Sequence, residues 1–114
     1  MRRKNKMFYL KKTLDISAAH RLMLSYPSQC QNLHGHNFQV TVFCKNKELD
    51  ENGMIIDFTE IKRIVNQLDH ANLNDVLHFN PTAENIAEWL CKKIPFCYRI
   101  EIEETKNNQV AYEL

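Results

Sequence analysis

The sequence predicts an α+β domain, a four-stranded antiparallel sheet with two helices on one face, in the order ββααββ. Two segments, Phe8–His20 and His34–Lys45, alternate hydrophobic and polar residues with the period of a half-buried strand. Helical spacing follows between residues 57 and 95, and alternation returns from residue 98. Because 114 residues can bury one modest core, we expect a single domain over residues 1–114.

The first two strands carry three histidines on their hydrophobic faces. In the first strand His20 shares the face of Ile16, and in the second His34 and His36 share the face of Phe38. An imidazole on a core-facing side needs a polar partner, and a metal ion is a natural one.

The two helices are expected to begin at polar caps. Asp57 is placed to cap the first, with Glu60 in the capping-box position, and an apolar stripe continues to Leu68. A polar loop then leads to Thr82, which can cap the second helix, and Pro95 ends that helix. Capping accounts for Asp57 without a catalytic role.

The last two strands form a hairpin that turns at residues 105–108. In the first of them Tyr98, Ile100 and Ile102 are expected to face the core, and the same alternation turns Glu104 inward. Four strands leave two open sheet edges, which proteins usually cover or pair. We therefore expect a homo-oligomer that assembles through its sheet edges.

Composition gives no reason to expect a nucleic-acid or membrane partner. The formal net charge is +1, and no apolar segment is long enough for a signal peptide or a bilayer span. Four cysteines without a secretory signal are expected to be reduced thiols, which favours a cytoplasmic location. The two glycines are too few for a glycine-rich phosphate-binding loop.

A metal site is the main chemical prediction. His34 and His36 are two residues apart, so both imidazoles lie on one face of a strand, and a neighbouring antiparallel strand can bring His20 beside them. Three imidazoles form the protein part of an open Zn²⁺ site, with the fourth position free for water or substrate. The alternative is three unrelated histidines, one of them hydrogen-bonded in the core.

Cys30 has two possible roles beside this site. It lies in a polar loop four residues before His34, where burial on a strand face does not explain it. As a fourth ligand it would close the zinc site and make the site structural. As a free thiol beside the metal it would have a lowered pKa and act as a base. The spacing alone does not decide between these roles.

Two further features can carry chemistry. Asp69 and His70 are an adjacent acid and imidazole, an arrangement that can orient a histidine for proton transfer but that also occurs on many surface loops. Glu104, facing inward at a strand end, can accept two N–H groups from a guanidine-like heterocycle. Its alternative is a buried salt bridge with an arginine or lysine.

Six segments occur in an order and at a spacing that resembles the 6-pyruvoyltetrahydropterin synthase family. They are ISAAHRL, CQNLHGH, GMIIDF, LDHANLND, NPTAEN and EETKNN. Two details resemble the bacterial 6-carboxy-tetrahydropterin synthase branch, which acts in queuosine biosynthesis. One is the segment GMIIDF with Asp57, and the other is the spacing of three residues between Cys30 and His34. A folate-pathway branch has glutamate at the cysteine position. Ile16 departs from the family, which usually has phenylalanine there.

The resemblance implies the tunnelling fold (T-fold), whose units join edge to edge into a barrel, usually a hexamer of two trimers. It implies that His20, His34 and His36 are zinc ligands. The implied substrate is 7,8-dihydroneopterin triphosphate, which is converted to 6-carboxy-tetrahydropterin, acetaldehyde and triphosphate.

The resemblance also assigns the remaining site residues. Cys30 would be the catalytic cysteine, Asp69 and His70 the proton-relay pair, and Glu104 the residue that anchors the pterin. Arg21, next to a zinc ligand, is a candidate for contact with the triphosphate. Two alternatives remain: a pyruvoyl-forming synthase that keeps the carbon side chain, and a non-catalytic zinc-stabilised module closed by the cysteine.

Overall fold

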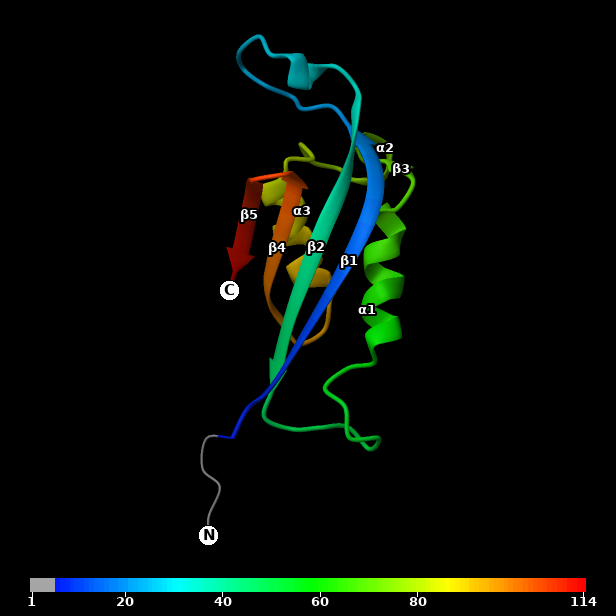
Figure 1. The fold of residues 1–114 in the computed structure, drawn as a ribbon, viewed down its shortest axis with the longest axis vertical. Coiled ribbons are helices and arrows are strands. Elements are labelled where there is room, and N and C mark those ends of the chain that lie inside the picture. Colours follow the sequence, from blue (N-terminus) through cyan, green and yellow to red (C-terminus); the bar gives the residue numbers. More distant parts are fainter. Residues whose placement is uncertain (1–5) are drawn as a thin grey trace.

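The computed structural model describes residues 6–114, which form an α+β fold in which two long strands run the length of the molecule (Figure 1). These strands are β1 (Phe8–His20) and β2 (His34–Asn46), which pair antiparallel over their full length. The hairpin of β4 (Cys97–Thr105) and β5 (Asn108–Glu113) continues the sheet on the side of β2. The predicted strands and hairpin are therefore present.

The sheet has five strands, in the order β3-β1-β2-β4-β5, so the prediction of four antiparallel strands is wrong. The additional strand, β3 (Ala71–Asn72), pairs parallel with β1 and makes the sheet mixed. It lies in the segment that the sequence predicts to be a polar loop. This segment docks because the Asp69 carboxylate accepts a hydrogen bond from the Ser17 N–H at 2.8 Å, and the His70 N–H donates to the Ser17 carbonyl.

Two main helices, α1 (Phe58–Val65) and α3 (Ala83–Lys93), cover one face of the sheet, as predicted (Figure 1). A short third helix, α2 (Leu73–Val76), follows β3, and single turns of 3₁₀ helix occur at η1 (Gln29–Gln31) and η2 (Asn66–Leu68). Among residues 6–114, no helix is both long and apolar enough to span a lipid bilayer.

The helix caps follow the sequence with one exception. The Asp57 side chain accepts a hydrogen bond from the Thr59 N–H at 2.8 Å and caps α1. Thr82 caps α3 through the Asn85 N–H. Glu60 does not complete a capping box, because its carboxylate binds the Arg63 guanidinium one turn further on instead.

The core lies between the sheet and the two main helices. The largest of its fully buried hydrophobic side chains come from β2, β4, α1, α3 and the segments after α1. They are Phe38, Val40, Val42, Ile61, Val65, Leu68, Leu73, Ile86, Leu90, Ile100 and Ile102. Removing large hydrophobic side chains from water is the main favourable contribution to folding. It therefore determines which face of each strand points inward.

Tyr98 does not face the core, contrary to the simple alternation. The register between β2 and β4 shifts after Phe43, so that Cys44 pairs with Cys97 rather than with Tyr98. The Tyr98 ring instead contacts Phe43 and Tyr9, each with ring centroids 6.3 Å apart, on the outer face. A β-bulge changes the side of the sheet on which the following residue projects, which alternation alone does not reveal.

Candidate metal centre

The β1–β2 register brings the three histidines together. His20 pairs directly with His34, and Ala18 with His36, so all three imidazoles stand on the inner face at one end of the sheet. The ring centroids are 4.6 Å apart for His20 and His34, 4.7 Å for His34 and His36, and 5.2 Å for His20 and His36. The fully buried Phe38 ring packs against His20 and His36, with ring centroids 5.5 and 5.4 Å away.

Backbone carbonyls orient two of the rings. Nδ1 of His20 lies 2.7 Å from the Pro81 carbonyl oxygen, and Nδ1 of His34 lies 2.8 Å from the Asn32 carbonyl oxygen. A carbonyl only accepts hydrogen bonds, so each Nδ1 carries the proton and each Nε2 keeps its lone pair. This is the arrangement that metal-binding histidines generally show. The sequence gives no signal for either carbonyl, because any residue type provides one.

Glu104, at the end of β4, completes the cluster. One carboxylate oxygen, Oε1, lies 3.0 Å from Nε2 of His36 and 3.8 Å from Nε2 of His20. Among the described residues, the four side chains His20, His34, His36 and Glu104 offer donor atoms that all lie within 4.8 Å of one another. The alternation in the sequence predicts that Glu104 faces inward, but not that it lies this close to the imidazoles.

The chemistry of this donor set fits a metal ion. Within residues 6–114, two buried polar side-chain atoms have no hydrogen-bond partner, and both are imidazole nitrogens: Nε2 of His20 and Nε2 of His36. His20 is fully buried, so its Nε2 cannot be satisfied by bulk water. Three imidazoles and one carboxylate at this spacing match the ligand types that Zn²⁺ prefers.

The cluster also holds the pKa of Glu104 below its ordinary value. The contact with His20 is the largest cause and the charge of His36 adds to it, while burial acts in the opposite direction. Burial lowers the pKa of His36, and the two other imidazoles reinforce this. For His20, burial acts to lower the pKa, but the Glu104 carboxylate and the Pro81 carbonyl outweigh it and raise the pKa. Glu104 is thus ionised at neutral pH and can only accept hydrogen bonds.

Cys30 lies beside the cluster in an exposed turn. A cavity of about 250 Å³ is lined by Gln29, Cys30, His34, His36 and Glu104. The turn is ordered locally, because Ser28 and Gln31 form a capping box around η1 and the Cys30 carbonyl accepts a hydrogen bond from the Leu22 N–H at 2.7 Å. Arg21 lies outside the set of residues that line this cavity.

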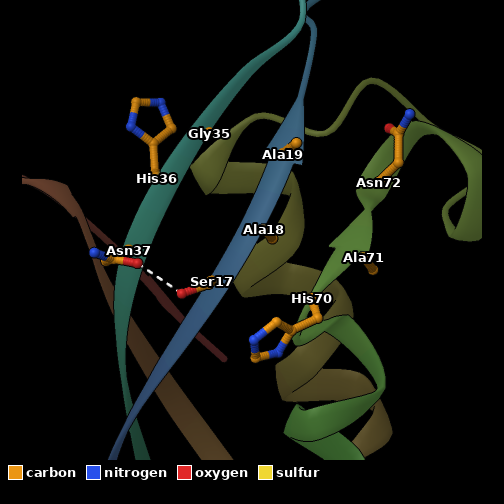
Figure 2. A pocket seen from close by; sticks show the side chains of 9 residues that line it. All are labelled: Ser17, Ala18, Ala19, Gly35, His36, Asn37, His70, Ala71 and Asn72. Atoms are coloured by element: carbon orange, nitrogen blue, oxygen red, sulfur yellow. Dashed lines mark hydrogen bonds between the residues drawn. The ribbon is translucent and has the colours of Figure 1, made fainter.

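Asp69 and His70 pair with each other, but at the other side of the two long strands. Oδ2 of Asp69 lies 3.1 Å from Nδ1 of His70, and the His70 side chain is 83% exposed. His70 lines a second cavity, of about 510 Å³, together with His36, Ser17, Asn37 and small residues of β1, β2 and β3. In Figure 2, β1 and β2 run between the imidazoles of His36 and His70. Within one chain, the relay pair therefore does not share the cavity of Cys30.

Backbone hydrogen bonds fix the position of Asp69 and His70. The pKa of Asp69 is lowered mainly because its carboxylate accepts a hydrogen bond from the Ser17 N–H, and the neighbouring His70 lowers it further. His70 has a φ of 57°, the left-handed conformation that non-glycine residues adopt infrequently. The contacts with Ser17 hold it in this conformation at the sheet edge.

Comparison with known proteins gives a consistent result. Residues 9–114 match the family model described as 6-pyruvoyl tetrahydropterin synthase. A 6-carboxy-5,6,7,8-tetrahydropterin synthase from Bacillus subtilis is 28% identical over 92% of this chain and 84% of its own length. Human 6-pyruvoyl tetrahydrobiopterin synthase is 32% identical over 88% of this chain and 87% of its own. The structure of a Caenorhabditis elegans 6-pyruvoyl tetrahydropterin synthase superposes with a TM-score of 0.75 at 26% identity, covering 96% of both chains.

Proposed function

Because the chain belongs to the 6-pyruvoyl tetrahydropterin synthase family, we propose that it is a zinc-dependent 6-carboxy-5,6,7,8-tetrahydropterin synthase of queuosine biosynthesis. The proposed reaction converts 7,8-dihydroneopterin triphosphate and water to 6-carboxy-tetrahydropterin, acetaldehyde and triphosphate. The observation that carries the proposal is the single cavity that joins two of the clustered histidines, an exposed cysteine and an inward carboxylate. The similarity to the Bacillus subtilis protein supports this branch of the family.

The metal would be held by His20, His34 and His36. When bound, Zn²⁺ supplies a Lewis acid that makes a neighbouring C–H group of the substrate side chain more acidic. His20 is positioned for this task by the Pro81 carbonyl, and His34 by the Asn32 carbonyl. These contacts hold the Nε2 lone pairs toward the cluster of donor atoms before any ligand binds, so little reorganisation is needed.

Glu104 would anchor the pterin ring. A pterin presents an amide N–H and an amino group side by side, and a carboxylate can accept both in two parallel hydrogen bonds. The lowered pKa of Glu104 keeps this group ionised and therefore free to accept both. The position of Glu104 beside the histidines would place the side chain of the pterin at the metal.

Cys30 and His70 would move protons. The Cys30 thiolate would remove a proton from the substrate side chain, and His70, oriented by the Asp69 carboxylate at 3.1 Å, would act at the other side. Since the two groups lie on different sides of β1 and β2, we propose that His70 comes from a neighbouring copy of the chain. Pairing of sheet edges in a barrel-like hexamer of two trimers would provide that neighbour.

Product analysis tests this proposal directly. Purified protein loaded with Zn²⁺ is incubated with 7,8-dihydroneopterin triphosphate, and acetaldehyde, triphosphate and the pterin product are measured. We expect acetaldehyde and triphosphate in equal amounts, and both to form about 10²–10⁴-fold more slowly with the Cys30→Ala variant. Absence of both products with the unaltered protein would overturn the proposal.

A pyruvoyl-forming synthase is the second candidate, favoured by the human relative. It would release triphosphate without acetaldehyde in the same assay. The non-catalytic module closed by Cys30 has less support, because the described donor atoms that converge come from three histidines and Glu104 rather than from the thiol. The cytoplasmic location stays a prediction.

A further inference from the structure

Glu104 lies close to the Nε2 atoms that the proposed metal would bind. The same oxygen, Oε1, approaches Nε2 of His36 at 3.0 Å and Nε2 of His20 at 3.8 Å. Two ligand atoms bound about 2.0–2.1 Å from a tetrahedral zinc ion stand about 3.4 Å apart. The two observed distances lie on either side of this value, so one ion can contact the carboxylate and both imidazoles.

The contact between the Glu104 carboxylate and a neutral His20 is unfavourable without a cation between them. The Pro81 carbonyl fixes the proton of neutral His20 on Nδ1, so the Nε2 lone pair faces a carboxylate oxygen that also carries lone pairs. Neither this Nε2 nor that of His36 has a hydrogen-bond partner in the described part of the chain. A divalent cation between them satisfies both nitrogen atoms and the carboxylate at once.

The backbone at Glu104 departs from regular strand pairing. The pairing of β4 with β5 shifts between Glu103 and Thr105, so Glu104 occupies an irregular point at the strand end. Its side chain is 27% exposed, whereas His20 beside it is fully buried. Irregularities of this kind occur next to active sites, where they direct a single side chain.

We propose that Glu104 is the fourth protein ligand of the metal in the substrate-free protein and that pterin binding removes it from the metal. The second half rests on the proposed function. A pterin needs both carboxylate oxygens for its two N–H groups, and the metal needs one of the same two oxygens. Transfer of Glu104 to the pterin therefore opens a coordination position when the substrate arrives, so that the substrate side chain can reach the metal.

Metal affinity tests the first half without any substrate. Zinc dissociation constants are measured by competition with a chromophoric chelator for the unaltered protein, Glu104→Gln and Glu103→Gln. Glu103 is the matched control, because it is the adjacent carboxylate and pairs with Gln39 on β2. We expect Glu104→Gln to weaken zinc binding by at least about 10–100-fold, the loss produced by removing a residue that only supports a metal ligand, and Glu103→Gln to have no effect. Equal affinities of the unaltered protein and Glu104→Gln would overturn the assignment.

The visible spectrum of the Co²⁺-substituted protein tests the second half. Adding neopterin, which lacks the phosphates, should change the Co²⁺ absorption bands, and Glu104→Gln should show no such change. Pterin binding, measured separately by fluorescence, with an unchanged Co²⁺ spectrum would overturn the release of Glu104. No pterin binding would overturn both the release and the proposed function, whereas the zinc affinities would still decide whether Glu104 is a ligand.

Discussion

Nδ1 of His20 lies 2.7 Å from the carbonyl oxygen of Pro81, a contact that joins the end of β1 to the segment preceding α3. It links residues 61 positions apart in the sequence, and it is buried. This contact decides which nitrogen of the imidazole faces the other histidines. The orientation of the proposed metal site thus depends on the packing of α3 against the sheet. Since this contact involves His20 and not His34 or His36, replacing His20 should affect stability differently from replacing the other two.

Removing His34 should abolish metal binding with little cost to the metal-free fold, because His34 is only partly buried. We expect roughly one Zn²⁺ per chain in the unaltered protein and almost none in His34→Ala or His36→Ala, measured by atomic emission. His78→Ala provides a control outside the cluster and should retain the metal. Full occupancy in His34→Ala would exclude this histidine as a ligand.

Removing His20 should affect stability as well as metal binding. The fully buried ring fills space beside Phe38, and its loss leaves the Pro81 carbonyl without its partner. An unsatisfied buried polar group costs about 1–3 kcal/mol. We expect metal-free His20→Ala to unfold at a lower denaturant concentration than metal-free His34→Ala. Identical unfolding midpoints would show that the Pro81 contact contributes nothing to stability.

Replacing Cys30 should separate catalysis from structure. The thiol is exposed and belongs to a single 3₁₀ turn, so Cys30→Ala should leave the melting temperature and the zinc content unchanged. Turnover should fall by about 10²–10⁴-fold, the effect of losing a positioned base. Zinc content, melting temperature and turnover are measured on the same preparation. Loss of zinc together with a lowered melting temperature would instead favour the structural module.

Mixing two inactive variants tests whether neighbouring copies share the active site. Cys30→Ala and His70→Ala are denatured together, refolded with Zn²⁺ and assayed. If each site combines Cys30 of one copy with His70 of another, random assembly leaves both groups intact in about a quarter of the sites. Each variant refolded alone is the control. No recovery of activity in a mixture that light scattering shows to be oligomeric would place both groups in one chain.

The Asp69 carboxylate gives a pH dependence with a defined sign. Its pKa is lower in the folded chain than in the unfolded chain, mainly because it accepts the Ser17 N–H. The unfolded state therefore takes up the proton first as the pH falls. The stabilisation is fully present above the unfolded value of about 3.9 and is lost as the pH falls through the folded pKa.

The measurement compares melting temperatures of the unaltered protein and Asp69→Asn between pH 7 and pH 3. The difference should be constant near neutral pH and should shrink below about pH 4, where Asp69 becomes protonated first in the unfolded state of the unaltered protein. Asp15→Asn removes a carboxylate two positions from Ser17 without removing this contact and serves as the control. A difference that persists unchanged to pH 3 would contradict the contribution of the ionised group.

The sequence by itself determined the two long strands, the C-terminal hairpin and the two main helices, together with most of the faces that point inward. Alternation from Phe8 to His20 and again after His34 is a local property, because successive side chains of a strand point to opposite sides. It therefore predicts three inward imidazoles and an inward Glu104. The caps at Asp57 and Thr82 are likewise local, since each side chain binds a backbone N–H within three residues.

Only the tertiary structure decided how these faces meet. The pairing of His20 with His34, the bulge that turns Tyr98 outward and the docking of β3 on Ser17 all depend on contacts between distant segments. Periodicity gives the face of a strand but not its register, and a bulge shifts the register without a clear sequence signal. The Pro81 carbonyl that orients His20 has no side-chain signature at all, because every residue carries a carbonyl group.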